Sequence, residues 1–337
     1  MTETIVKTDT YNDIAVIGAG AWGTALAAAA ARAGRRVRLW ARESEVVQSI
    51  KAFHENTLFL PGIKLPAGIE PTADVTAAVR ADALLLAAPA QHLRSTLELV
   101  VPLLTDRPPL FTCAKGIEHR TAKLMTEVLA DFVTKDQIGI LSGPAFARDV
   151  VNNLPTAVTI AGSIAAAQRL QASLSHAGFR PYASDDVTGV ALGGAAKNVY
   201  AIACGIVSGM GLGESARAAL LARGFAELRR LGEALGARAE TLMGLSGLGD
   251  LVLTATSRTS RNYAFGIAIG KGSSPAELDA RGHPLAEGVE TAPALVARAK
   301  RHGVELPIAE TAAAILDGSL ALDEAIRRLM MRPLKDE

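Results

Sequence analysis

The stretch "DIAVIGAGAWGTALAAAAARAG", Asp13 to Gly34, decides the fold of this chain. Its apolar start at 13–17 is typical of a buried strand, and the alanine-rich run Ala21–Ala33 predicts a helix that ends at Gly34. The glycines between strand and helix have the spacing G-x-G-x-x-G. That pattern, directly after a strand and at the start of a helix, is typical of a turn that holds a dinucleotide.

Each of the three glycines in this turn has its own physical reason. Gly18 allows the tight turn, Gly20 lets the backbone approach a pyrophosphate, and Gly23 lets the helix pack closely on the strand. The helix N-terminus offers N–H groups and a partial positive charge to the phosphates. We therefore predict dinucleotide binding here, with a purely structural glycine turn as the alternative.

The composition favours a soluble globular protein of the cytoplasm. The chain has 337 residues, of which 49% are hydrophobic and 20% charged, so a large core can form. A net charge of +1 argues against broad nucleic-acid binding but permits a small anionic ligand. The polar N-terminus lacks a signal-peptide pattern, and no apolar run approaches the roughly 20 residues that span a bilayer. Cys113 and Cys204 have no metal-ligand spacing, so no metal site is predicted and reduced thiols are expected rather than a disulfide.

The order of elements predicts a doubly wound α/β sheet followed by helices. Further strands are expected at 35–40, 81–89, 109–116, 138–144, 156–162 and 179–184, with helices from about Gln91, near Thr121–Phe132 and between the last two strands. From about Asp185 onward the apolar spacing is helical, and the helices are separated by Gly211, Gly236, Gly282 and Gly303. We predict a Rossmann-like dinucleotide-binding domain over 1–188 and an all-helical substrate and catalytic domain over 189–337.

The end of the second strand bears on the choice of dinucleotide. An acidic residue at this point binds the ribose 2′-hydroxyl of NAD, whereas a guanidinium suits the 2′-phosphate of NADP. Here the strand ends in "RLWARES", with Arg42 at its tip and Glu43 behind it. NADP(H) is therefore favoured and NAD(H) remains possible, because Glu43 is an alternative ribose ligand if Arg42 is only solvated.

Several polar residues stand where chemistry is expected. Lys115 in "CAKGIE" follows a strand, as does Gly143 in "SGPAFA", and ligands bind beyond the carboxyl ends of such strands. Lys197 in "GGAAKNVYAIACGI" lies in a strongly apolar helix, so it either snorkels to water or faces a polar cleft as a proton-transfer group. Gly193 and Gly194, one turn earlier, suggest the close approach of a ligand or another backbone.

Two later motifs add an acid and a candidate phosphate site. Asp250 in "GLSGLGDLVLT" is either a helix N-cap or a functional carboxylate. Ser260, Arg261 and Asn262 in "TSRTSRNYAFG" bring together a hydroxyl, a guanidinium and an amide, which are groups that bind phosphate. By itself this second motif is also consistent with a solvated helix start.

Together these segments resemble the bacterial NAD(P)-dependent glycerol-3-phosphate dehydrogenase family from about residue 13 to the C-terminus. The resemblance rests on the ordered set "VIGAGAWGTALA", "AKGIE", "SGPAFA", "LGGAAKNVYAIACG", "RGFAELRRLGEALGA", "GLSGLGDLVLT", "SRNYAFG" and "AEGVETA". It implies hydride transfer between NAD(P)H and dihydroxyacetone phosphate, which supplies glycerol phosphate for phospholipid synthesis. A homodimer and the absence of membrane insertion are further expectations.

The resemblance also implies roles for individual residues. It makes Lys197 the proton donor and acceptor, with Lys115 and Asp250 as catalytic partners. The substrate would be surrounded by Lys115, Gly143, Ala145, Lys197, Asp250, Ser260, Arg261 and Asn262. The cofactor would be lined by Gly18, Gly20, Ala21, Trp22, Gly23, Arg42, Lys115, Ala147, Arg261, Leu285 and Glu287. Ala145 departs from the family, which often has Ser or Thr there, so a substrate contact at that point must come from backbone or water.

Two other functions are consistent with parts of the sequence. A β-hydroxyacid dehydrogenase also combines a dinucleotide domain with a helical domain and a catalytic lysine, but it acts on small carboxylates. A non-catalytic NADP(H)-binding sensor would need the glycine turn without Lys197, Asp250 and Arg261. The sequence leaves the cofactor ratio, the oligomeric state, feedback control and the physiological direction open.

Overall fold

The computed structural model describes residues 9–280 and 286–331, and the chain divides into two compact units. The sheet unit comprises the chain up to Ala114 together with Met125–Val190. The helical unit comprises Lys115–Leu124 together with the chain from Ala191 onward. The main boundary thus falls at 190/191 rather than 188/189, and the short segment Lys115–Leu124 joins the helices although strand and helix of the other unit flank it in the sequence.

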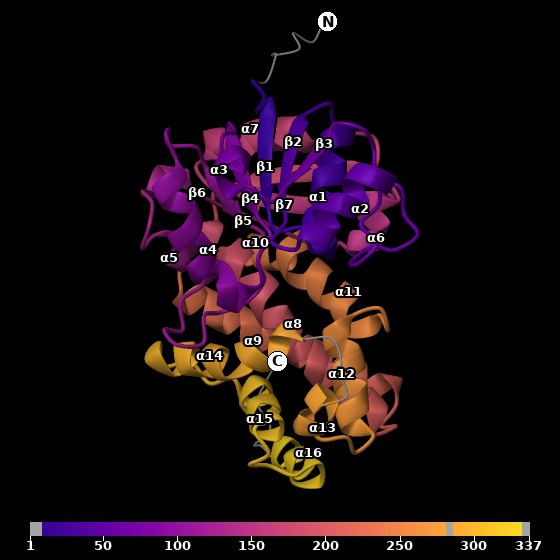
Figure 1. The fold of residues 1–337 in the computed structure, drawn as a ribbon. Helices are drawn as coiled ribbons and strands as arrows, with labels where there is room; N and C mark the ends of the chain where they lie inside the picture. The colour runs from indigo at the N-terminus through magenta and orange to yellow at the C-terminus, as the bar shows by residue number, and fades with distance from the viewer. Residues whose placement is uncertain (1–8, 281–285, 332–337) are drawn as a thin grey trace, which may run out of the picture. The chain divides into compact units, whose positions relative to one another are not determined.

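An eight-stranded sheet organises the sheet unit, with strand order β3-β2-β1-β4-β5-β6-β7-β8 (Figure 1). Neighbouring strands are parallel except β6 and β7, which pair antiparallel. The order reverses at β1 and β4, which makes this pair the switch point where ligands bind in such folds. The strands are β1 (Asp13–Ile17), β2 (Arg36–Trp40), β3 (Ile69–Thr72), β4 (Ala83–Leu86), β5 (Leu110–Thr112), β6 (Ile138–Ser142), β7 (Thr156–Ala161) and β8 (Phe179–Ser184).

Helices cover both faces of this sheet, because alternate residues of its strands are buried in two separate cores. In β1, Ile14 and Val16 belong to one core, whereas Ala15 and Ile17 belong to the other. The first core is closed by α1 (Ala21–Arg32), α2 (Ser44–Phe53), α6 (Ala147–Val151) and α7 (Ile164–Leu174). The second is closed by α3 (Val75–Ala78), α4 (Leu93–Val100) and α5 (Met125–Leu129). The predicted doubly wound fold is confirmed.

The structure adds elements to the sequence-based expectation of this unit, namely strand β3 and the helices α2, α3 and α6, and it shortens one expected helix. Strand β3 was not among the expected strands, and its residue Pro71 cannot donate a ladder hydrogen bond. Since β3 is the edge strand, Pro71 is tolerated there. The helix expected near Thr121–Phe132 is only α5, because residues 117–124 form a tight loop closed by a bridge between Ile117 and Leu124.

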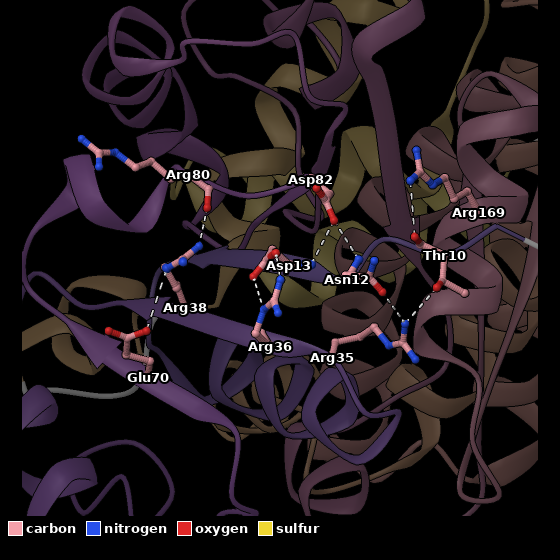
Figure 2. A network of polar contacts seen from close by, with 10 residues as sticks. All are labelled: Thr10, Asn12, Asp13, Arg35, Arg36, Arg38, Glu70, Arg80, Asp82 and Arg169. Atoms are coloured by element: carbon pink, nitrogen blue, oxygen red, sulfur yellow. Dashed lines mark hydrogen bonds and ion pairs between the residues drawn. The ribbon is translucent and has the colours of Figure 1, made fainter.

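Arginines in and just before β2 form hydrogen bonds with neighbouring segments of the sheet unit (Figure 2). The guanidinium of Arg36 donates two hydrogen bonds to Asp13, at 2.7 and 2.5 Å. Arg35 donates to the Thr10 hydroxyl at 2.9 Å, and Arg38 donates to the carbonyl of Arg80. Arg35 and Arg36 lie at the end of the strands opposite to the glycine turn, and Arg38 lies in the middle of β2.

Helices make up all the regular structure described in the helical unit, as expected from about Asp185 onward. They are α8 (Val187–Gly209), α9 (Glu214–Ala234), α10 (Ala239–Met243), α11 (Asp250–Thr256), α12 (Arg261–Gly270), α13 (Pro275–Ala280), α14 (Glu287–Arg301), α15 (Pro307–Leu316) and α16 (Leu322–Met330). Gly211, Gly236 and Gly303 follow helices with positive φ angles of 72°, 76° and 65°, as helix-ending glycines do. Gly282 lies outside the described residues.

Glycines allow α8 and α12 to pack at very close range. A Cβ on Gly205 of α8 would lie 2.3 Å from the carbonyl oxygen of Tyr263, and one on Gly266 of α12 would lie 2.2 Å from that of Ile202. Gly209 and Gly270 repeat this contact one turn later. The close crossing brings the start of α12 to the side of α8 that carries polar residues.

Helix α8 is long and apolar enough to cross a bilayer by length and composition alone. The sequence-based statement that no apolar run approaches this length therefore needs correction. However, 94% of its most apolar window is buried inside the protein. The apolarity of α8 is explained by its packing against other helices.

Candidate active site

Two lysines and one aspartate form a buried charge cluster within the helical unit. The ammonium Nζ of Lys197, on α8, lies 2.6 Å from Oδ1 of Asp250. The ammonium Nζ of Lys115 lies 2.7 Å from the other carboxylate oxygen, Oδ2. The side chains of Lys197, Lys115 and Asp250 are only 9%, 14% and 1% exposed. Neither lysine is an ordinary solvated residue, and Lys197 does not snorkel to water.

The local sequence presents Asp250 to the lysines through an unusual turn. Residues Leu245–Gly249 form a π-helical turn directly before α11, whose first residue is Asp250. Within this turn a Cβ on Gly247 would lie 1.9 Å from the carbonyl oxygen of Leu242. On α8, a Cβ on Gly193 would lie 2.7 Å from the carbonyl oxygen of Ser246. The glycine before Lys197 is thus explained by the close approach of another backbone, which brings α8 and Asp250 together.

Electrostatics within the cluster shift two of its groups. Burial lowers the pKa of Lys197 to about 8, because it disfavours the ammonium; Asp250 acts against this, and the charge of Lys115 adds to it. Burial alone would raise the pKa of Asp250, but the charges and hydrogen bonds of both lysines outweigh burial, and the pKa lies below its usual value. Lys197 can therefore exchange a proton near neutral pH while Asp250 stays ionised.

Thr254 is a further member of the cluster that sequence reasoning missed. Its hydroxyl oxygen lies 2.7 Å from Nζ of Lys197 and donates to Oδ1 of Asp250 at 3.1 Å. The residue is only 3% exposed. Its position four residues after Asp250 in one helix was the available signal, since such residues share a helix face. Thr254 orients the lysine without changing the charge of the site.

A chain of amide groups links the segments around this cluster. Asn198 donates to the carbonyl of Lys115 at 2.9 Å, and Asn262 donates to the side-chain oxygen of Asn198 at 2.9 Å. The side-chain oxygen of Asn262 accepts the backbone N–H of Gly288 at 2.9 Å. Both ends of the Asn262 amide are thus engaged within the protein.

The start of α12 presents the other two residues of the predicted phosphate set. Ser260 is the N-cap, and its hydroxyl accepts the N–H of Tyr263 at 3.2 Å. Arg261 is the first helical residue and its side chain is exposed. The N–H groups of the first helical turn favour an anion at this end. The site thus offers a guanidinium and backbone donors, with Ser260 acting chiefly as the cap.

In the sheet unit, the glycine turn fits a dinucleotide. Gly18 has a φ of +108°, a conformation that side chains rarely adopt, and a Cβ on Gly23 would lie 1.8 Å from the carbonyl oxygen of Gly18. By contrast, a Cβ on Gly20 would meet no protein atom within 4 Å, so this glycine leaves room for a ligand rather than for packing. No side chain caps α1, which begins at Ala21 and Trp22, and its first turn has no acidic residue. The geometry suits an anion at the α1 N-terminus.

Asn56 stabilises the glycine turn through hydrogen bonds, a role that the sequence alone did not indicate. Its amide nitrogen donates to the carbonyl of Ala19 and to the hydroxyl of Thr24, both at 2.8 Å. Its side-chain oxygen accepts the N–H of Phe59 at 3.1 Å. Asn56 is 0% exposed. A fully buried, fully bonded amide 37 residues from Ala19 fixes the peptide between Gly18 and Gly20.

Replacing Asn56 with alanine is expected to weaken dinucleotide binding. The change leaves the Ala19 carbonyl buried without its donor, which costs about 1–3 kcal/mol and loosens the turn. The dissociation constant of NADPH, measured by quenching of tryptophan fluorescence, should rise roughly tenfold, the equivalent of about 1.4 kcal/mol. Asn12→Ala, an exposed asparagine at the opposite edge of the sheet, is the matched control. Unchanged affinity in Asn56→Ala would show that the turn holds its shape without this amide.

The remaining predicted residues lie at several points of the two units. Arg42, directly after β2, is 83% exposed and pairs with Glu43 at 3.1 Å, so its geometry is compatible with either the solvated or the ligand role. Gly143 follows β6 with a φ of +151°, and a Cβ there would lie 2.8 Å from the Cα of Val158. Ala145 and Ala147 pack against the first sheet core. Glu287 begins α14, and Leu285 lies outside the described residues.

Comparisons with known proteins identify relatives over most of the chain. Residues 13–168 match the family model described as NAD-dependent glycerol-3-phosphate dehydrogenase N-terminus, and residues 186–327 match the C-terminal model of the same family. A glycerol-3-phosphate dehydrogenase [NAD(P)+] of Parvibaculum lavamentivorans is 53% identical over 97% of this chain and 98% of its own. One from Bradyrhizobium sp. strain BTAi1 is 56% identical over 97% and 99%. The crystal structure of the Coxiella burnetii glycerol-3-phosphate dehydrogenase is 36% identical, with a TM-score of 0.89 over 95% of this chain and 99% of that one.

Proposed function

Since this chain belongs to the NAD(P)-dependent glycerol-3-phosphate dehydrogenases, we propose that Lys197 is the proton-transfer group of its reaction. The protein is an oxidoreductase that interconverts dihydroxyacetone phosphate and sn-glycerol 3-phosphate. The reading as a β-hydroxyacid dehydrogenase or as a non-catalytic sensor is not favoured by these relatives. The observation that carries the residue assignment is the pairing of Lys197 and Lys115 with one buried carboxylate.

The cluster can perform the proton step of ketone reduction. The bound reduced nicotinamide supplies the hydride to C2 of dihydroxyacetone phosphate. As negative charge develops on the carbonyl oxygen, the Lys197 ammonium stabilises it and transfers a proton, so that an N–H bond breaks and an O–H bond forms. In the reverse direction the neutral amine of Lys197 accepts the hydroxyl proton. Asp250 and Thr254 hold the amine in place through both steps.

The other charged groups would bind and orient the substrate. Lys115 would contact the substrate and, through its charge, keep the pKa of Lys197 low. The Arg261 guanidinium and the N–H groups at the start of α12 would bind the phosphate, and Gly143 and Ala145 would contribute backbone. Binding energy from the phosphate then orients the reacting carbon.

For the cofactor, the glycine turn is the proposed pyrophosphate site. Gly18, Gly20, Ala21, Trp22 and Gly23 would hold the phosphates at the N-terminus of α1, and Arg42 would bind the 2′-phosphate of NADP. Further contacts are proposed for Lys115, Ala147, Arg261, Leu285 and Glu287. NADP(H) is the favoured cofactor and NAD(H) is possible, as the family name allows.

The pH dependence of the reaction is expected to follow Lys197. Its pKa of about 8 predicts that kcat/KM for ketone reduction is flat below this pH and falls above it, because the ammonium is the acid. For oxidation of glycerol 3-phosphate the amine is the base, so the rate should rise through the same pH. Initial rates from pH 6 to 10 in both directions provide the measurement. If the rates of reduction and oxidation both rise, or both fall, through this pH, the assignment of Lys197 is contradicted.

Arg42→Ala is expected to change cofactor choice without changing chemistry. Loss of a charge-assisted hydrogen bond of about 1.5–3 kcal/mol to the 2′-phosphate should raise the KM for NADPH roughly 10- to 100-fold. The KM for NADH should stay near its original value, because NADH carries no such phosphate. Arg36→Ala, at the opposite end of β2, is the control. An equal loss with both cofactors would exclude a 2′-phosphate role for Arg42.

The activity itself is tested with purified protein. Oxidation of NADPH and NADH is followed with and without dihydroxyacetone phosphate, and with a small 2-keto acid in its place. Saturable oxidation that requires the phosphorylated ketone is expected. Turnover of the keto acid alone would favour a hydroxyacid enzyme.

We also propose that the protein is a cytoplasmic homodimer whose product enters phospholipid synthesis. Exposed apolar side chains of the helical unit, such as Leu212, Met243 and Val252, are consistent with a partner surface. Light scattering of the purified protein would give its oligomeric state directly.

A further inference from the structure

Lys115 is the first residue of a short segment that belongs to the helical unit. Residues Lys115–Leu124 pack with the helices, although the chain on both sides belongs to the sheet unit. Lys115 must therefore be held in place by contacts within the helical unit. Its ammonium bonds Asp250 and its carbonyl accepts the amide of Asn198, and both contacts lie at the start of the segment.

The segment has a defined shape because it closes on itself. Ile117 and Leu124 form an antiparallel bridge, and the N–H of Glu118 donates to the carbonyl of Lys123 at 2.9 Å. Ala122 adopts a left-handed backbone conformation with a φ of 57°, which residues other than glycine rarely adopt. Because the loop is closed by these contacts, bonds made at its tip also bear on the position of Lys115 at its start.

Two arginines of helix α14 donate hydrogen bonds to the backbone at the tip of this loop, Thr121 and Ala122. Nη1 of Arg298 donates to the carbonyl of Ala122 at 3.0 Å, and Nη1 of Arg301 donates to the carbonyl of Thr121 at 2.7 Å. Arg298 is only 9% exposed and Ala122 is 2% exposed, whereas Arg301 is on the surface. A guanidinium is almost never buried without a partner, and here a partner is the backbone of the loop.

Helix α14 is itself tied to the charge cluster at its other end. The N–H of Gly288 donates to Asn262, which is bonded to Asn198 and through it to the carbonyl of Lys115. A Cβ on Gly288 would lie 2.7 Å from the carbonyl oxygen of Asn198, so the backbones of α14 and α8 are in close contact at this glycine. The helix therefore has little freedom to shift, and it is a firm support for the loop.

We propose that Arg298 is a positioning residue that holds the Lys115 loop against α14 and thereby keeps the Lys115 ammonium at Asp250. Arg301 supports the same loop from the surface. Both arginines bond the backbone of the loop, so each acts through the loop. The inference deepens the proposed function and rests on it, because it takes Lys115 as a substrate contact.

The test compares Arg298→Met with Lys115→Met as the reference variant. Arg298→Met is expected to raise the KM for dihydroxyacetone phosphate roughly tenfold, since a small displacement of a binding group has effects of this size or larger. The alkaline limb of the reduction should move to higher pH in both variants, because the neighbouring charge that opposes the Lys197 ammonium is displaced or removed. The charged groups that act on Lys197 are Asp250, Lys115 and Glu287, and only Lys115 moves. Because Lys115 is also a proposed cofactor contact, the Kd for NADPH in Arg298→Met should change no more than it does in Lys115→Met.

Three further variants sharpen the comparison. Arg298→Lys retains the charge but not the planar fork, so its KM and alkaline limb should fall between those of wild type and Arg298→Met. The double variant Lys115→Met/Arg298→Met should be no worse than Lys115→Met alone. Lys300→Met removes an exposed cation of the same helix and should behave as wild type.

The outcomes separate this inference from the proposed function. Wild-type KM and pH limb in both Arg298 variants, with a clear effect of Lys115→Met, would mean that Arg298 is only structural and would overturn the positioning role. If Lys115→Met itself leaves both quantities unchanged, the substrate role of Lys115 fails and the inference fails with it. If Arg298→Met does not fold, Arg298→Lys decides between the same two results.

Discussion

Replacement of Lys197 by methionine is expected to remove nearly all turnover while NADPH still binds. Methionine fills a similar volume but carries no proton, so the developing charge on the substrate oxygen loses its acid and its counter-charge. A positioned proton donor contributes about 10²–10⁴-fold, and kcat should fall by at least that factor in both directions. Steady-state kinetics gives kcat, and fluorescence titration gives the Kd of NADPH.

The control for this variant is Lys271→Met, an exposed lysine that follows α12 in the same unit. It removes the same charge from the surface and should leave kcat unchanged. A Lys197→Met enzyme with a kcat within a few-fold of wild type would end the assignment of Lys197 as proton donor. Loss of NADPH binding together with kcat would instead point to a misfolded variant.

The second large effect is expected from Asp250→Asn. The change retains the shape of the side chain but leaves the Lys197 and Lys115 ammonium groups without their shared counter-charge in a buried site. Breaking a buried ion pair from one side typically costs about 3–5 kcal/mol, so the free energy of unfolding in urea should fall by an amount of this order. Catalysis should fall as well, because the amide no longer orients the Lys197 amine.

The pH profile of Asp250→Asn provides a second, independent measurement. Asp250 raises the pKa of Lys197 against burial, so its removal should lower that pKa further. The alkaline limb of ketone reduction should then move to lower pH, opposite in direction to the shift expected for Lys115→Met. Asp317→Asn, an exposed aspartate after α15, serves as the control. If Asp250→Asn has the stability and pH limb of wild type, the cluster does not carry the charges assigned to it.

Part of this protein was determined by local sequence, because the physics involved is local. The strand, the turn and helix α1 follow from 22 consecutive residues, Asp13–Gly34. The positive φ of Gly18 and the contact of Gly23 with the Gly18 carbonyl involve atoms only a few residues apart. The alternation of strands and helices, and the change to helices near Asp185, also follow from periodicity within short windows. The resemblance to a family added the identity of the reaction.

Other features depended on contacts between distant residues, and only the tertiary structure decided them. From its own helix, Lys197 was equally compatible with snorkelling to water, and the choice depends on Asp250, 53 residues away. Asn262 stays a predicted phosphate ligand, and the structure adds that its amide links Asn198 to Gly288. Strand β3 forms despite Pro71 because it lies at the sheet edge.

The segment Lys115–Leu124 illustrates the physical reason most directly. Its sequence continues a βα pattern and suggests a helix, yet it packs with helices that follow much later in the chain, and its backbone bonds side chains 83 and 180 residues away. Local propensities are small, whereas burial and hydrogen bonds to Asn198 and Arg298 are collective and specific. The sequence therefore determined the dinucleotide turn and the order of elements, and the tertiary structure decided which charges meet, because buried charges take their partners from any distance along the chain.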